Sequence, residues 1–505
     1  MKEWLSTGAS RAWFGVALAG LLVVALVFAL TLLPRLGAGQ RVIDAAEPAF
    51  TDTRVEATRA GVFTISQYVD VVDPLLTRRG GAVGETDRLI GYLRRKLGLS
   101  ADQVRKILRR EAPRTEALTR ALPLDGVAAE IPRLTAYLAT IMGLPEEEVA
   151  AILERDFPRI SQSLTALSNT ADAWYDVPGI DGLTRFSRGK PVRTGPGLRT
   201  DLRDDLVPLT VAHKDDFQSL AGSGGIGYIP YFLLVFGAGL LAFGALGVRR
   251  SLRKGPPGKL SWGVVVFAGL LLIAVVAAAQ YFPRLSDGQR AITAFEPAFT
   301  EERVRGAANG ADAIHEAVAF GDPLMTPRGG AASEVSGLYR FVAQRTGRRP
   351  DDVRAALRRR APRTTALLSA IPLTEVAREV PRLLAYLQRA LRRSRTEVVA
   401  TLRKRAPGLT QALVTLPDVS RAWSAIQGTE GMTRFDGLTP VRTVPEFDAY
   451  LREQLMPVLV SEREDFGTLA GGQPSLDTLA PALMVTGVFL LFYGGMMMQF
   501  VARTY

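Results

Sequence analysis

The segment DPLxTxRGG is the most specific arrangement of polar residues in the sequence, and it occurs twice. Asp73 and Arg79 in the first copy match Asp322 and Arg328 in the second. Two glycines follow each arginine, so the loop could expose backbone N–H groups while the guanidinium holds an anion. A helix end followed by an interhelical turn, with local pairing of aspartate and arginine, would explain the same residues. The glycine pair lacks the lysine and the spacing of a P-loop, so these four residues are candidates for binding an anion or a partner.

Two further carboxylates sit in a repeated EPAF segment, at Glu47 and Glu296. If the two segments lie opposite each other, the pair could handle ions or protons. The simpler interpretation is that each glutamate caps the next helix or pairs with a nearby arginine, Arg41 or Arg290.

Catalytic and metal-binding patterns are otherwise missing. The chain has no cysteine, which excludes disulfides, thiolate catalysis and cysteine-based metal sites. His213 and His315 are the only histidines, and they are not spaced as metal ligands. The G-x-S-x-G motif of serine hydrolases is absent. We therefore expect a protein that is not an enzyme and that needs no cofactor or metal.

Arginine clusters in the second half of the chain offer a different kind of site. They comprise Arg358, Arg359, Arg360, Arg389, Arg392, Arg393 and Arg395. On helices they could form a ridge that binds phospholipid head groups or an anionic wall polymer. A solvated helix face with acidic neighbours would give the same pattern. The first half has neutral or acidic residues at many matching positions, so we expect any such binding to be asymmetric.

The net charge of +12 is unevenly distributed along the chain. Residues 35–228 carry 26 basic and 26 acidic residues, whereas residues 283–478 carry 28 basic and 23 acidic residues. A short linker, 249–261, contributes five basic residues and no acid. This division indicates no continuous basic face, so we expect no nucleic-acid partner.

Four uncharged apolar runs are long enough to cross a bilayer, which takes about 20 residues. They are 13–33, 228–248, 262–282 and 479–501. Buried core helices would be the alternative, but four such runs in one chain favour membrane spans. We therefore expect an all-α integral membrane protein with the lipid bilayer as its first partner.

Loop charges predict the orientation of these spans. The basic linker 249–261 should be cytoplasmic, which also places the tails 1–12 and 502–505 inside and the segments 34–227 and 283–478 outside. Small residues at 37–39 resemble a signal-peptidase site, but the first apolar run is long for a signal peptide, so we expect an uncleaved signal anchor. The arginine- and alanine-rich composition indicates a GC-rich bacterial genome, and hence a bacterial plasma membrane.

An internal similarity connects these features. At an offset of 249 residues the two halves align almost without gaps: EPAFT at 47–51 matches EPAFT at 296–300, and PVRT at 191–194 matches PVRT at 440–443. Such self-similarity predicts a tandem duplication. Each half contains two spans, so both copies should share one orientation about an axis along the membrane normal. We expect two homologous extracytoplasmic helical bundles, side by side.

A shorter similarity lies inside each extramembrane segment, at an offset of 45 residues. Residues 99–114 match 144–159, with apolar residues at helical spacing. Ser100 and Ser394 each start a capping-box pattern. Prolines should then break or kink each helix, at Pro113, Pro158, Pro362 and Pro407.

The exception to the helical pattern is TRF…PVRT, at 184–194 and 433–443, which predicts a short β-hairpin in each half, the first across the turn SRGK.

Two functions remain open at this stage. The first is a non-enzymatic envelope protein whose paired domains bind a partner protein, a lipid or an anionic polymer outside the membrane. The alternative is a transporter, a channel or an accessory subunit of a transport complex that uses the interface between the two copies. The four runs contain no charged residue, which weakens the transport hypothesis. The sequence does not define the oligomeric state.

Overall fold

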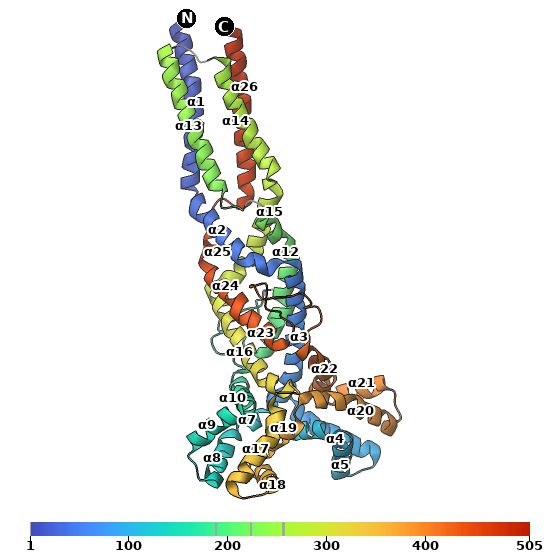
Figure 1. Ribbon diagram of the computed structural model, residues 1–505. Helices are drawn as coiled ribbons and strands as arrows, with labels where there is room; N and C mark the ends of the chain where they lie inside the picture. Colours follow the sequence, from blue (N-terminus) through green and yellow to red (C-terminus); the bar gives the residue numbers. More distant parts are fainter. Residues whose placement is uncertain (1, 187–188, 223–224, 255–257, 505) are drawn as a thin grey trace. The chain divides into compact units, whose positions relative to one another are not determined.

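The computed structural model of this chain describes residues 2–186, 189–222, 225–254 and 258–504 (Figure 1). These residues form helices, turns and loops, and no strand occurs among them. Four of the helices are long and apolar enough to cross a membrane. The protein is therefore an all-helical membrane protein, as the sequence predicts.

The residues divide into two compact units, each built from both halves of the chain. Unit 1 comprises Met1–Val55, Leu209–Val304 and Val458–Tyr505. The helices that lie wholly or mostly in it are α1 (Lys2–Ala29), α2 (Leu32–Ala46), η1 (Glu47–Phe50), α12 (Val207–Ala221), α13 (Ile229–Lys254), α14 (Lys259–Ala278), α15 (Tyr281–Phe295), η4 (Glu296–Phe299), α24 (Met456–Ser461), α25 (Arg463–Ala470), η6 (Leu476–Thr478) and α26 (Leu479–Thr504).

Unit 2 comprises Glu56–Pro208 and Arg305–Pro457. Its helices from the first half are α3 (Asp52–Leu76), η2 (Arg78–Gly80), α4 (Ala82–Leu97), α5 (Ala101–Glu111), α6 (Pro113–Ala121), α7 (Asp125–Ala128), α8 (Ile131–Met142), α9 (Glu146–Asp156), α10 (Pro158–Ala173), α11 (Gly195–Asp201) and η3 (Leu202–Leu206). Those from the second half are α16 (Glu301–Met325), α17 (Ala331–Thr346), α18 (Pro350–Arg360), α19 (Pro362–Ala370), α20 (Leu373–Leu391), α21 (Arg395–Arg405), α22 (Pro407–Ser424), α23 (Val444–Tyr450) and η5 (Leu451–Leu455).

The candidate spans are α1, α13, α14 and α26, close to the predicted runs but with shifted ends. The first span ends at Ala29 rather than at residue 33, because Thr31 takes a left-handed backbone conformation and α2 starts afresh. Gln280, 249 positions later, does the same after α14. Each of these spans is therefore followed at once by a second helix with a new direction.

Glycines set the close packing of the spans. In Figure 1, α1 lies beside α13 and α14 lies beside α26. A Cβ on Gly20 of α1 would come within 2.7 Å of the Gly237 carbonyl oxygen, and one on Gly269 of α14 within 2.6 Å of the Gly487 carbonyl oxygen. Small residues allow such backbone contact between membrane helices.

Aromatic residues join the two helix pairs. Trp13 of α1 and Trp262 of α14 stack with their ring centroids 4.2 Å apart, and both are buried. The Tyr493 hydroxyl of α26 donates to the carbonyl oxygen of Ala12 at 2.9 Å. The sequence places the same two indoles, 249 residues apart, at the starts of the first and third spans.

Two arginines in unit 1, the buried Arg35 and the partly buried Arg284, link one half of the chain to the other. The Arg35 Nε of α2 donates to the Leu469 carbonyl oxygen at the end of α25, at 3.0 Å. The Arg284 Nε of α15 donates to the Ser219 carbonyl oxygen near the end of α12, at 3.1 Å. Since the last carbonyls of a helix lack partners within it, each arginine satisfies a helix end in the opposite half.

Unit 2 differs from the expected pair of separate bundles. Its largest core contains residues of both halves, including Leu118 on α6 and Leu367 on α19, and these two helices pack directly on each other. Helices from each half complete the core around helices of the other half. The two extramembrane segments therefore contribute to one compact unit.

Glutamates reach across this core to cap helices of the opposite half. Glu379 of α20 accepts hydrogen bonds from the backbone N–H groups of Arg114 and Thr115, at 3.1 and 2.8 Å, at the start of α6. Glu130 accepts from the N–H groups of Arg363 and Thr364, at 3.0 and 2.9 Å, at the start of α19. A carboxylate at a helix N-terminus satisfies otherwise unpaired donors and complements the helix dipole.

A second pair of glutamates makes the same kind of contact. Glu85 of α4 accepts from the backbone N–H groups of Gly408 and Leu409 at the start of α22. Glu334 of α17 accepts from those of Arg159 and Ile160 at the start of α10. Each of the four helices that follows a proline break is thus capped by the other half of the chain.

The local signals for helix ends are confirmed. Ser100 and Ser394 form capping boxes with Gln103 and Glu397. The four prolines that we expected to break or kink helices each open a new one: Pro113 begins α6, and the other three begin α10, α19 and α22. Proline is favoured there because the first helical position needs no N–H donor.

The predicted β-hairpins are reduced to isolated antiparallel bridges, Thr184 with Pro191 and Thr433 with Pro440. The proline in each bridge has no backbone N–H and cannot extend a ladder. In the turn SRGK, Ser187 and Arg188 lie outside the described residues.

Replacing Glu379 by Gln should lower the free energy of unfolding by about 1–3 kcal/mol. The carboxylate accepts hydrogen bonds from three donors, the N–H groups of Arg114 and Thr115 and the Thr115 hydroxyl, whereas an amide offers them only one oxygen. Thermal unfolding of the purified protein checks this. The exposed Glu147 provides the matched control as Glu147→Gln, with no shift expected. Equal melting temperatures for both variants would contradict the capping role.

Gly269→Ile should disturb the packing of α14 on α26 and lower the free energy of unfolding by about 1–3 kcal/mol, the usual cost of an overpacked contact. Gly263→Ile on the same helix is the control, since a Cβ there meets nothing within 4 Å. Thermal melting curves of the two variants, purified in detergent, give the comparison. If Gly263→Ile lowers the melting temperature as much as Gly269→Ile, the close contact is not the cause.

Candidate functional site

The first DPLxTxRGG segment ends α3 and forms a compact turn. Asp73 accepts hydrogen bonds from the Trp174 indole N–H and the Tyr175 hydroxyl, each at 2.9 Å. Arg79 is exposed, and its guanidinium lies 5.6 Å from the Tyr175 ring centroid. The N–H groups of Gly80 and Gly81 bond carbonyl oxygens inside the turn. In this arrangement the glycine N–H groups do not converge on an anion.

The second copy has the same aspartate contact. Asp322 accepts from the Trp423 indole N–H at 3.0 Å and from the Thr326 hydroxyl at 3.2 Å. Arg159, which comes from the other half, lies 3.7 Å from its carboxylate. Arg328 is exposed. The two aspartates therefore anchor a tryptophan to the end of a long helix, and the two arginines remain at the surface.

Glu47 and Glu296 begin the short helices η1 and η4, and both are exposed. Within the described residues the two carboxylates do not bond to each other. The arginines that we considered as their partners have other acids: Arg41 lies 2.6 Å from Asp465, and Arg290 2.8 Å from Asp216.

The histidines are paired with aspartates in different units. In unit 1, His213 Nδ1 lies 2.9 Å from Asp216. In unit 2, His315 Nδ1 of α16 lies 2.6 Å from the buried carboxylate of Asp448 on α23. The hydrogen bond to Asp448 raises the pKa of His315 above its usual value. No group of three or more His, Asp or Glu side chains in the described part of the chain could hold a metal ion.

The clustered arginines of the second half fall into two separate lobes of unit 2, and each lobe is built from both halves of the chain. Helices α4, α5, α20 and α21 form the first, which we call the basic lobe (residues 82–111 and 373–405). Arg389, Arg392 and Arg393 belong to it. Helices α8, α9, α17 and α18 form the second lobe (residues 131–156 and 331–360), with Arg358, Arg359 and Arg360 in the last turn of α18.

Charge is concentrated in the basic lobe. It carries 17 basic and 7 acidic residues, net +10, against 10 basic and 8 acidic residues, net +2, in the second lobe. All 17 basic side chains are exposed. Within the described residues only three of them make an ion pair: Arg109, Arg110 and Arg378. The positive surface is therefore largely uncompensated.

Helix capping removes two acids from this surface. Of the seven acidic residues in the basic lobe, Glu85 and Glu379 are buried as caps of helices from the opposite half. Glu397 closes the capping box of α21. Glu85 and Glu379 are therefore held inside the fold and are not available to pair with the exposed basic side chains, whereas Glu397 stays exposed.

Half of the basic lobe was missed by reasoning from the sequence. The first half supplies Arg88, Arg94, Arg95, Lys96, Arg105, Lys106, Arg109 and Arg110. The first extramembrane segment has a net charge of zero, and this total conceals the local cluster. A shorter window would have found the site, since residues 88–110 contain eight basic residues and one acid.

The pair of His315 and Asp448 makes a pH-dependent contribution to stability. A raised pKa in the folded protein means that this contribution is complete below the unfolded value, about 6.5. It is lost as the pH rises through the folded pKa of His315. Arg452 lowers this pKa and Glu316 raises it, both less than Asp448 does.

NMR titration of His315 in a His213→Gln background, which leaves one imidazole, should give a pKa above 6.5. Asp448→Asn should bring it down, because burial and Arg452 then act without the carboxylate. An unchanged pKa in Asp448→Asn would show that the pair does not form.

Known proteins give no further guidance to this arrangement. No protein-family model matches the chain, and no curated protein or solved structure matches it either. The contacts of the described residues are therefore the basis for assigning a function.

Proposed function

We propose that this protein is a non-enzymatic, membrane-anchored binding protein of the bacterial cell envelope, and that its basic lobe binds an anionic polymer. The observation that carries this proposal is the set of 17 exposed basic side chains on four packed helices, 14 of them without an ion pair among the described residues. Such a field attracts a polyanion and releases its counterions on binding.

A polymer is favoured over a lipid surface by the absence of apolar anchors. Helices that lie on a bilayer present Trp, Phe or Leu beside their basic residues. In residues 82–111 and 373–405, all of which the structure describes, no large hydrophobic side chain is strongly exposed. The apolar residues of the lobe instead form its own core, around Tyr92, Val104 and Leu384.

The membrane topology is part of the proposal. The basic linker 249–261 favours cytoplasmic termini and an extracytoplasmic basic lobe, with the first span kept as a signal anchor. Gly255, Pro256 and Pro257 of that linker lie outside the described residues. An extracytoplasmic lobe would meet envelope polymers rather than nucleic acid.

Tandem duplication explains the paired contacts best. The glutamate caps, the aspartate–tryptophan bonds and the Trp13–Trp262 stack all join positions that recur 249 residues apart. An ancestor of half the length could have formed a dimer in which each subunit capped and packed the helices of the other. Fusion of the two subunits into one chain would keep these contacts. Divergence of charge after fusion would then make one lobe the binding site.

Transport is the weaker alternative. The described spans pack through glycines and stacked indoles, and their charged residues lie at the helix ends. A coupled transporter needs ionisable or interrupted segments within the bilayer.

The test is retention of the purified protein on immobilised inorganic polyphosphate over a salt series. Arg389→Gln, Arg393→Gln and Arg395→Gln together should weaken binding by roughly ten- to a hundredfold, and should make it less dependent on salt. The control removes three charges from the second lobe, at Arg358, Arg359 and Arg360, and should change binding far less.

Two outcomes would contradict this function. Equal losses in both triple variants would show attraction to net charge without a site. Tighter binding to phosphatidylglycerol vesicles than to polyphosphate, lost in the basic-lobe variant alone, would make the partner a lipid surface.

A further inference from the structure

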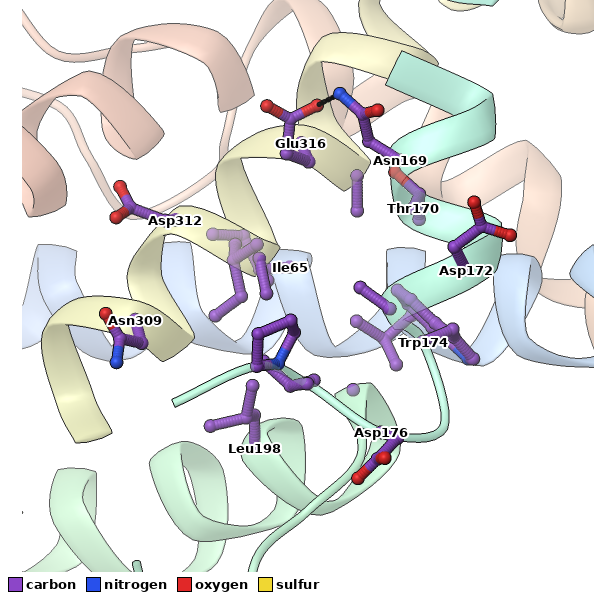
Figure 2. Close-up of a pocket in the computed structure, with 18 of the residues that line it drawn as sticks. Ile65, Asn169, Thr170, Asp172, Trp174, Asp176, Leu198, Asn309, Asp312 and Glu316 are labelled. Carbon is purple, nitrogen blue, oxygen red and sulfur yellow. Dashed lines mark hydrogen bonds between the residues drawn. The ribbon is translucent and has the colours of Figure 1, made fainter. Parts of the chain in front are cut away.

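Unit 2 contains a cleft of about 550 Å³ that the basic lobe does not include. Its walls come from α3, α10, α11 and α16, together with the loop after α10 (Figure 2). The centre of the cleft is apolar, with Ile65, Trp174 and Leu198 facing one another. This volume is typical of sites for small ligands.

The rim of the cleft is acidic. Asp172, Asp176, Asp312 and Glu316 surround the apolar centre, and none of the residues that line the cleft is basic, all of them described. Glu316 accepts one hydrogen bond, from the Asn169 amide at 3.3 Å. In a chain of net charge +12, four carboxylates around one opening form a local region of opposite sign.

A buried hydroxyl adds an independent observation. Thr170 lines the cleft, is 3% exposed, and its Oγ1 has no hydrogen-bond partner among the described residues. A buried polar atom without a partner is costly, and native proteins rarely keep one without a reason. A ligand with a polar group would satisfy it once the Thr170 side chain rotates toward the cleft.

The residues 249 positions away from those that line the cleft do not form a second cleft of the same kind. Leu198 corresponds to Phe447, which is fully buried and packs against Gly61. At the rim, Asp172 corresponds to Arg421 and Asp312 corresponds to Phe63. The larger side chain occupies the space that is open beside Leu198, and the acidic rim is lost. The two sides of unit 2 therefore differ in both volume and charge.

We infer that this cleft binds a small organic cation with an apolar body. The apolar centre would take the body of the ligand, and the carboxylates would hold the positive charge. Cations are also attracted to the face of an indole, and Trp174 supplies one in the wall. This site is separate from the basic lobe and does not depend on the function proposed for it.

The probe is tetraphenylphosphonium, and its binding is measured by calorimetry with the whole 505-residue chain in nanodiscs, against empty nanodiscs. Tetraphenylborate has the same shape and the opposite charge, so it separates charge from apolar partition. We expect the cation to bind saturably and the anion not to bind. Replacing Asp172, Asp176 and Asp312 by Asn should weaken cation binding by about tenfold or more, as expected for several exposed charges acting together.

Leu198→Phe copies the residue at position 447 and should abolish binding by filling the cleft. Asp181→Asn, an exposed acid of the same segment that does not line the cleft, is the control and should bind normally. Melting curves separate loss of the site from loss of the fold, and the rim variant keeps the test valid if Leu198→Phe does not fold. Equal binding of both tetraphenyl ions, or cation binding unchanged in the rim variant, would overturn the inference.

Discussion

Four helices of unit 2 begin at a proline, and the N–H groups at their first turns have no partner within the helix. Each is capped by a glutamate from the opposite half of the chain. A buried end of this kind is tolerated only when it is satisfied. The caps therefore require both halves to be present in one unit, and the shared apolar core, which contains residues of both halves, depends on the same arrangement.

The capping requirement also shapes the charge of the surface. A carboxylate that binds backbone N–H groups inside the fold is not available to neutralise arginines outside it. In the basic lobe this holds for Glu85 and Glu379, while the basic residues of α4, α5, α20 and α21 stay exposed. Opposite sides of unit 2 also differ in shape, since Leu198 leaves the acidic cleft open where Phe447 fills the matching space. One scaffold thus carries a cationic surface and an anionic cleft.

Local signals in the sequence predicted the elements well. The four spans follow from apolar length, and the capping boxes at Ser100 and Ser394 follow from spacing of three residues. What could not be predicted depends on distant contacts. Glu130 resembles an ordinary surface acid until its partners, more than 230 residues later, are brought to it. For the same reason the sequence indicated only the arginines of α20 and α21 as a basic site. Helices α4 and α5, which complete the basic lobe, are distant from them in sequence. The aspartates of the cleft come from two separate segments, residues 172–176 and α16, and only the fold brings them together.

Amide hydrogen exchange, measured on the separated halves of the chain, tests most directly whether each half needs the other to complete its helices. Residues 1–254 would be purified alone and also after co-expression with residues 259–505. The account predicts that the amides of Arg114 and Thr115, which Glu379 of the second half caps, exchange about a hundredfold or more faster in the first half alone, since their protection then falls to that of local opening. Equal protection of these amides in the isolated first half and in the complex would contradict it, because each half would then complete its own core.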